Sequence, residues 1–201
     1  FLLPYLLPLA LYRIMNGLVP QEEGASRLIK GVYHPWAVAL SIQYIYGAFP
    51  ILEDALKLFP ELYSTWLRLW GSKVGRRVFF APGFNLIDRG HIEIGDDVMF
   101  GLGVIVSPHM ARCRGQRKMV YLKKVRVGDG AFVGGRSYLG PGSEISARHS
   151  LPGFSNMTVN MKDQCLVPEP RSLPVLPLEA PTADERRDWI RDLRPVKLAG
   201  A

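Results

Sequence analysis

The sequence predicts a mainly β protein: a parallel β-helix with an apolar α-helical segment before it and an extended segment after it. The first observation is an aliphatic or aromatic residue that recurs every six positions through the middle of the chain. The second is that residues 1–71 lack this period and are apolar. The third is the density of proline beyond residue 166. We therefore expect three regions: residues 1–71, 72–165 and 166–201.

The first region is expected to be mostly helical, and its opening stretch has three interpretations. Residues 1–10 are apolar, but they fall short of the ~20 residues that a membrane-spanning helix needs. They are the end of a longer membrane segment, an interfacial anchor, or a segment packed on the domain. The chain begins with Phe1 and not with methionine, so we expect further sequence upstream.

Two further helices are expected in this region. Residues 35–50 are apolar and rich in aromatic side chains, which fits either a core helix or a helix at the depth of lipid headgroups. Residues 52–70 are expected to form a helix that is broken near Pro60 and stops at Gly71. Nothing in residues 1–71 has a catalytic pattern.

The six-residue repeat defines the second region. A six-residue period is the signature of a parallel β-helix, in which each repeat is one short strand and its corner. The aliphatic side chain points into a narrow prism, and the small residue that usually follows lets the chain turn at a crowded corner. The repeat positions are Val74, Phe80, Leu86, Ile94, Phe100, Val106, Val127, Val133, Leu139, Ile145, Leu151 and Met157.

Two interruptions break the repeat. A short one falls at residues 88–91, and a long one separates Val106 from Val127 by 21 residues. The excess, residues 107–124, must leave the coil as a loop. Loops that protrude from a rigid scaffold often carry function, so this insertion is the first place to look for a site.

The third region is expected to lie along the surface. Five prolines between residues 168 and 181 favour an extended strap in residues 166–201. Thr182 and Glu185 form a capping box for a short terminal helix.

Composition limits the class of protein. A chain of 201 residues with 48% hydrophobic and 21% charged residues forms a core, as one compact domain or two small ones. Its 25 Lys and Arg against 18 Asp and Glu give a formal charge of +7. Two cysteines without a C-x-x-C spacing argue against a disulfide-rich secreted protein. We expect a cytoplasmic protein, with peripheral attachment to the cytoplasmic face of a membrane left open.

Two stretches of the coil resemble a known family. The runs IEIGDDVMFGLGVIVSPH (92–109) and VRVGDGAFVGGRSYLGPGSEI (125–145) resemble the hexapeptide-repeat acyltransferases, which have a left-handed β-helix, and in particular the galactoside and maltose O-acetyltransferases. The preceding YHPWAVALSIQY (33–44) and WLRLWGSKVGRRVFFAPG (66–83) resemble colanic-acid-type acyltransferases and the C-terminal portion of nonribosomal-peptide-synthetase-like proteins. The resemblance covers roughly residues 30–167.

The resemblance implies an assembly and a donor. Members of this family are usually trimers that bind acyl-CoA, or sometimes an acyl carrier protein, at the seam between subunits. We therefore expect a homotrimer with acyl-CoA, most simply acetyl-CoA, or an acyl carrier protein as the donor. A monomer is the alternative, because the apolar N-terminal helices could cover the face that would otherwise bind a second copy.

The resemblance also assigns residues on the acceptor side. His109, at the exit of a coil, matches the position of the general base, because a neutral imidazole can deprotonate a hydroxyl or amine near neutral pH. Asn85 and Asp88 match polar residues that bind the acceptor or orient the histidine, and a carboxylate beside an imidazole fixes its tautomer. His91, beside the short interruption, is a candidate for lining the acceptor pocket.

Donor-side candidates lie on later coils. Gly134 and Gly135 match the coil where family members hold the thioester with main-chain N–H groups. Arg136, Arg148 and Lys162 are candidates for the phosphates of CoA. Lysines and arginines of the insertion could attract an anionic donor, an acidic carrier protein or anionic lipid, and we expect no nucleic acid partner because no matching fold motif accompanies them.

Two rival chemistries rank lower. No two histidines are spaced three or four residues apart, and we find no three-histidine set of the carbonic-anhydrase type, so we expect no metal. Cys113 lies among arginines, which lower a thiol pKa, but the family transfers acyl groups directly, so a nucleophilic cysteine ranks below His109.

The sequence therefore predicts an enzyme that moves an acyl group from a thioester to a hydroxyl or amine. The acceptor can be a small molecule, a saccharide, a peptide or a lipid-linked compound. The alternative is a non-catalytic β-helix that serves as a scaffold or carrier-docking module.

Overall fold

The computed structural model describes residues 2–29, 31–114 and 117–163, and for residues 113, 114 and 117 the backbone only. The chain divides into residues 1–168 and a second unit, residues 169–201. The predicted strap and terminal helix of residues 166–201 lie outside the described residues.

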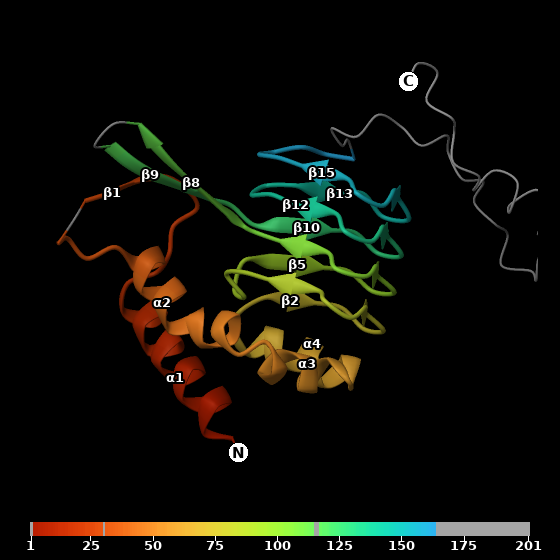
Figure 1. Cartoon of the computed structure of the whole chain (residues 1–201), viewed down its shortest axis with the longest axis horizontal. Coiled ribbons are helices and arrows are strands. Elements are labelled where there is room, and N and C mark those ends of the chain that lie inside the picture. Colours follow the sequence, from red (N-terminus) through yellow and green to blue (C-terminus); the bar gives the residue numbers. More distant parts are fainter. Residues whose placement is uncertain (1, 30, 115–116, 164–201) are drawn as a thin grey trace, which may run out of the picture. The chain divides into compact units, whose positions relative to one another are not determined.

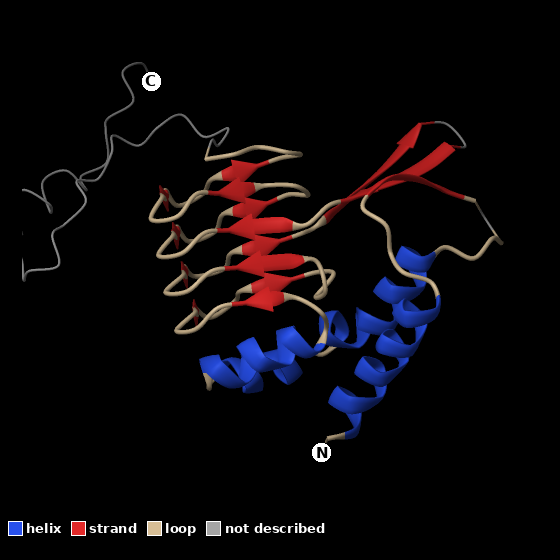
Figure 2. Cartoon of the chain, turned by 180° about the vertical axis from the view of Figure 1, so that it is seen from behind, coloured by secondary structure: helices blue, strands red, loops and turns tan. Residues whose placement is uncertain are grey.

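The middle of the chain is a stack of coils, each made of three short strands (Figures 1 and 2). In chain order the strands are β2 (Lys73–Val74), β3 (Phe79–Phe80), β4 (Asn85–Leu86), β5 (Ile92–Ile94), β6 (Met99–Phe100), β7 (Ile105–Val106), β10 (Val125–Val127), β11 (Phe132–Val133), β12 (Tyr138–Leu139), β13 (Glu144–Ile145), β14 (Ser150–Leu151) and β15 (Asn156–Met157). They pair in parallel as three sheets, ordered β13-β10-β5-β2, β14-β11-β6-β3 and β15-β12-β7-β4. The predicted parallel β-helix is confirmed, and its left hand stays a prediction.

The repeat side chains form the core of the coil. All twelve repeat positions from Val74 to Met157 are buried, as predicted. They stack in register from coil to coil, for example Val74 on Ile94 and Val127 on Ile145. A residue with a left-handed backbone recurs at the corners at the same spacing, such as Arg136 (φ 57°) and Gly142 (φ 73°). The six-residue period thus sets both the inward column and the corners.

Close stacking of the coils predicts a large effect at Gly134. A Cβ atom there would collide with the backbone nitrogen of Gly153 in the next coil, which cannot move aside. We expect Gly134→Ala to lower the free energy of unfolding by about 1–3 kcal/mol or more, measured by urea unfolding. Gly17→Ala is the control, because nothing lies within 4 Å of its added methyl group. Equal unfolding midpoints for the two variants would contradict this account of coil packing.

Four helices precede the coil: α1 (Leu3–Leu18), α2 (Pro35–Ala48), α3 (Ile51–Lys57) and α4 (Pro60–Leu69). The expected break near Pro60 is the boundary between α3 and α4. Figure 1 shows α3 and α4 at the β2 end of the coil, with α1 and α2 extending to the side where β1, β8 and β9 lie. At the β2 end the buried Tyr63 of α4 contacts Phe80 edge-on, with ring centroids 4.8 Å apart. The helices therefore close the first coil with aromatic side chains.

The insertion is a β-hairpin and not a loop, which corrects the prediction for residues 107–124. It consists of β8 (His109–Arg114) and β9 (Arg117–Leu122), which pair antiparallel. A third strand, β1 (Gly24–Leu28), pairs with β9 inside the region expected to be helical. Antiparallel pairing between segments so far apart leaves no mark on the six-residue period. We call β1, β8 and β9 the arm.

Candidate active site

The two interruptions of the repeat meet in space. His109 is the first residue of β8, and Asp88 lies in the short interruption after β4. Nδ1 of His109 lies 2.5 Å from Oδ2 of Asp88. The Asp88 side chain is only 1% exposed, whereas the His109 side chain is 16% exposed. A buried carboxylate therefore holds an imidazole that solvent can still reach.

Trp36 of α2 completes this group. Its Nε1–H donates to Oδ1 of Asp88 at 3.1 Å, and its ring centroid lies 4.7 Å from that of His109. Trp36 is buried and packs against Val120 and Leu122 of the arm. Both oxygens of the Asp88 carboxylate are thus engaged, one by an indole and one by the imidazole. The sequence analysis missed Trp36, because neither the composition of residues 35–50 nor the resemblance of residues 33–44 indicated a role for it.

The backbone around Asp88 is fixed from the helices. Asp88 has a left-handed backbone (φ 48°), which aspartate tolerates better than most residues. The N–H of Arg89 donates to Oε1 of Gln43 at 2.8 Å, and Nε of Arg89 donates to Oε1 of Glu53 at 2.8 Å. The Arg89 and Glu53 side chains are both buried. Since Glu53 neutralises Arg89, the negative charge of Asp88 faces His109.

This arrangement defines what His109 can do. With Nδ1 against the carboxylate, the neutral imidazole carries its hydrogen on Nδ1 and its lone pair on Nε2. Nε2 can then accept a proton from a hydroxyl or amine placed beside it. The site therefore has the geometry of an oriented general base.

His91 lies next to this group but is held differently. Its side chain is buried, and Nδ1 has no hydrogen-bond partner among the described residues. Its backbone N–H donates to the carbonyl oxygen of Asp88 at 2.9 Å. Burial lowers the pKa of His91, although the carboxylates of Asp88 and Glu23 act in the opposite direction. His91 is thus a neutral imidazole near neutral pH.

The lowered pKa of His91 predicts a pH-dependent stability. Below the ordinary pKa of about 6.5, His91 is protonated in the unfolded chain but stays neutral in the folded protein until the pH reaches its lowered pKa. The free energy of unfolding should therefore fall as the pH drops through about 6.5 toward the lowered value. His91→Gln should remove this part of the dependence, measured by urea unfolding at about pH 7.5 and pH 5.5. An equal change in the free energy of unfolding between the two pH values for the wild-type protein and His91→Gln would contradict the prediction.

Asn85 is not part of this group. It lies on β4 with its side chain exposed on the outside of the sheet, next to Ile105 in register. Within the described part of the chain, its side chain makes no hydrogen bond to Asp88 or His109. Its predicted contact with an acceptor stays a prediction.

The two donor-side glycines differ in the use of their amides. The N–H of Gly134 donates to the carbonyl of Leu151 at 2.8 Å, so coil stacking uses it. The N–H of Gly135 has no backbone acceptor among the described residues, and only its carbonyl is used, by Phe154. Of the two predicted thioester donors, Gly135 is therefore the one whose N–H has no backbone acceptor among the described residues.

The predicted phosphate-binding cations lie on the outside of the coil. Arg136 is exposed, with its guanidinium 5.8 Å from the ring centroid of Phe154. Arg148 is exposed at a corner with a left-handed backbone. The backbone of Lys162 forms a parallel β-bridge with that of Glu144, and Lys162 lines a groove of about 410 Å³. Their binding of CoA stays a prediction.

The same groove carries a column of alternating charges. Nζ of Lys73 lies 3.3 Å from Oε1 of Glu93, and Nε of Arg126 lies 3.2 Å from Oε2 of Glu93. NH1 of Arg126 lies 3.1 Å from Oε1 of Glu144, and Lys162 follows. We call these five residues the charge ladder.

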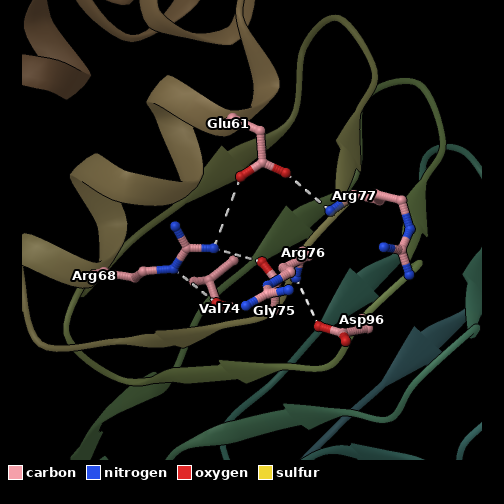
Figure 3. A pocket seen from close by; sticks show the side chains of 7 residues that line it. All are labelled: Glu61, Arg68, Val74, Gly75, Arg76, Arg77 and Asp96. Atoms are coloured by element: carbon pink, nitrogen blue, oxygen red, sulfur yellow. Dashed lines mark hydrogen bonds and ion pairs between the residues drawn. The ribbon is translucent and has the colours of Figure 1, made fainter.

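A second hollow, of about 610 Å³, joins α4 to the first coil (Figure 3). Nε of Arg68 donates to the carbonyl of Val74 at 2.8 Å, and NH2 donates to the carbonyl of Gly75 at 2.6 Å. Glu61 accepts from the N–H of Arg77 at 2.9 Å. These contacts fasten α4 to the coil, and neither Asp88 nor His109 lines this hollow.

The two lower-ranked chemistries concern a metal site and Cys113. Within residues 2–29, 31–114 and 117–163, no three His, Cys, Asp or Glu residues come together as metal ligands. The side chain of Cys113 lies outside the described part of the structure.

No family model matches the chain, and no curated protein matches it. Solved structures similar to it include a hexapeptide-repeat acetyltransferase from Vibrio cholerae O1 biovar eltor complexed with acetyl coenzyme A (17% identity, TM-score 0.42, 65% of this chain and 90% of that chain). A maltose O-acetyltransferase from Clostridium difficile is similar at 18% identity (TM-score 0.26, 59% and 81%). An N-acyltransferase from Bacillus cereus, in complex with dTDP and coenzyme A, is similar at 13% identity (TM-score 0.22, 61% and 82%).

Proposed function

We propose that this protein transfers an acyl group from a CoA or carrier-protein thioester to a hydroxyl or amine, with His109 as the general base. The observation that carries the proposal is the His109–Asp88 pair, held by Trp36 where the arm leaves the coil. The donor class follows the resemblance of residues 92–109 and 125–145 to the hexapeptide-repeat acyltransferases.

The proposed reaction proceeds by direct attack. Nε2 of His109 accepts the proton of the acceptor as its oxygen or nitrogen attacks the thioester carbonyl carbon. Asp88 stabilises the imidazolium that forms. The tetrahedral intermediate collapses, the carbon–sulfur bond breaks, and the leaving thiolate takes the proton from His109. The N–H of Gly135 is the candidate donor to the developing oxyanion.

The test measures thiol release from acetyl-CoA and longer acyl-CoAs against a panel of alcohols and amines, with acylated products identified by mass spectrometry. The proposal expects acceptor-dependent release that His109→Ala reduces. Donor binding is measured separately by calorimetry. If no thioester donor binds the wild-type protein, the scaffold alternative replaces the proposal.

We further propose that the protein acts as a homotrimer in the cytoplasm. Three side chains in register on the outside of one sheet, Phe79, Met99 and Phe132, are exposed and apolar, which suits a contact between copies. Light scattering should give the trimer mass, and Met99→Glu should lower it. A monomer mass for the wild-type protein would remove this part of the proposal.

A further inference from the structure

The arm is strongly basic. Its strands contain five cationic residues and no acidic one: Arg27, Arg112, Arg114, Arg117 and Lys118. The side chains of Arg27, Arg112 and Lys118 are exposed, and none of the three forms an ion pair with another described residue. Apolar side chains lie among and just beyond these cations, since Met119 and Ile29 are also exposed. The arm thus combines unpaired positive charge with apolar surface.

Helix α1 exposes an apolar face. One side, with Tyr12, packs inward, and Tyr46 of α2 donates to the carbonyl of Pro4 at 2.9 Å. The outward leucine and isoleucine side chains are half to three-quarters exposed, with Ile14 at 62%. Arg13 is the only charged residue in the helix. A helix with an apolar outer face needs an apolar medium or a partner.

The elements that carry these two surfaces lie on the same flank of the coil. Figures 1 and 2 both show α1, α2 and the arm on one side of the stacked strands. Trp36 of α2 packs on Val120 and Leu122 of the arm, and α1 packs on α2, so the parts are joined by direct contact. No described helix alone is long and apolar enough to cross a bilayer, although the bent pair of α2 and α3 (79°) reaches that length and composition together.

We propose that this flank binds the surface of an anionic lipid membrane. Hydrocarbon accepts the uncharged face of α1, and anionic headgroups complement the unpaired cations of the arm. A second copy of the chain would match the apolar face but not the cations, because the arm of that copy is equally basic. An acidic protein would match the cations but not the leucine and isoleucine side chains of α1. A lipid surface satisfies both at once.

This binding would bring His109 to the membrane surface. His109 begins β8, one of the strands of the arm. The acceptor class favoured by this geometry is a hydroxyl or amine carried on a lipid headgroup or a lipid-linked saccharide. That extension rests on the proposed function, whereas the binding itself does not.

The experiment measures flotation of the full chain with vesicles of phosphatidylcholine alone and of phosphatidylcholine with phosphatidylglycerol. Lys118→Glu changes the charge by two units, each worth about 5-fold in affinity near an anionic surface, so binding to the anionic vesicles should fall about 25-fold. Arg76→Glu is the matched control, because Arg76 is also exposed but lies at a corner of the first coil. High salt should reduce the difference.

The apolar contribution has its own pair of variants. Ile14→Glu should weaken binding to both kinds of vesicle by about tenfold or more. Leu102→Glu, at 56% exposure on the coil, should leave binding unchanged. Leu7→Glu, on the same face of α1, is the second variant if Ile14→Glu does not fold by circular dichroism. His109→Ala should bind vesicles like the wild-type protein, so loss of catalysis and loss of lipid binding are told apart.

Three results would overturn the inference. The first is a wild-type protein that fails to float with anionic vesicles. The second is a lower oligomer mass by light scattering for Ile14→Glu than for a wild-type protein that binds no vesicles. That result would mean that the outer face of α1 contacts a second copy of the chain. The third is equal weakening by Lys118→Glu and Arg76→Glu, which would reduce the arm to part of the overall positive charge.

Discussion

His109→Ala should lower turnover by about 10²–10⁴-fold, the usual contribution of a general acid or base. Donor affinity should stay nearly unchanged, because the imidazole acts on the proton of the acceptor. The free energy of unfolding should fall by about 1–3 kcal/mol, since the buried Asp88 carboxylate loses one of its two partners. Steady-state kinetics, calorimetry with the donor and urea unfolding measure the three quantities.

His149→Ala is the control for this variant, because His149 lies on a late coil away from the described pair. It should keep full activity. Full activity of His109→Ala with a genuine acceptor would mean that the base lies elsewhere, and His91 would be the next residue to replace.

Asp88→Asn should cost activity on the same scale, about 10²–10⁴-fold, through the tautomer of His109. Trp36 donates to Oδ1 and therefore holds the asparagine amide with its oxygen on that side. The NH₂ group then faces Nδ1 of His109, which must accept the hydrogen bond. The hydrogen of the neutral imidazole moves to Nε2, the atom that should receive the proton from the acceptor.

The double variant Asp88→Asn with His109→Ala separates orientation from an independent role. Because the two residues act as one unit, the double variant should be no slower than His109→Ala alone. Trp36→Phe keeps the Asp88 carboxylate but removes one hydrogen bond to it, worth about 1.5–3 kcal/mol. Turnover of this variant should therefore fall by at most about 10- to 100-fold. Additive losses in the double variant would show that Asp88 acts on the substrate directly.

The fold could be predicted because the sequence pattern of a β-helix repeats every six residues. Each inward residue and each corner repeats within six positions, so the positions from Val127 to Met157 could be placed without knowing any long-range contact. Strand β1 could not be predicted in this way, because it pairs with β9, which lies about 90 residues later in the sequence, and its five residues show no repeat. Local order in the sequence predicted local order in the fold and nothing beyond it.

The site was predictable only in part for the same reason. Asp88 and His109 each lie where the period fails, which marks them in the sequence. Trp36 reaches Asp88 from 52 positions away, and no period relates the two. Gly134 fitted the repeat so well that its stacking role and a donor role looked alike, and only the bond of its N–H to Leu151 separates them.

The charge ladder bears on how the chain finds its register during folding. Coils built from one repeat are nearly interchangeable inside, because a coil that skipped its neighbour would still bury equivalent aliphatic side chains. On the ladder such a slip is not neutral. Skipping one coil would set Lys73 against Arg126 and Glu93 against Glu144, and like charges directly opposite each other on a sheet are unfavourable. The alternating charges therefore favour the native stacking over a stack in which one coil is skipped, whereas the aliphatic core does not distinguish the two.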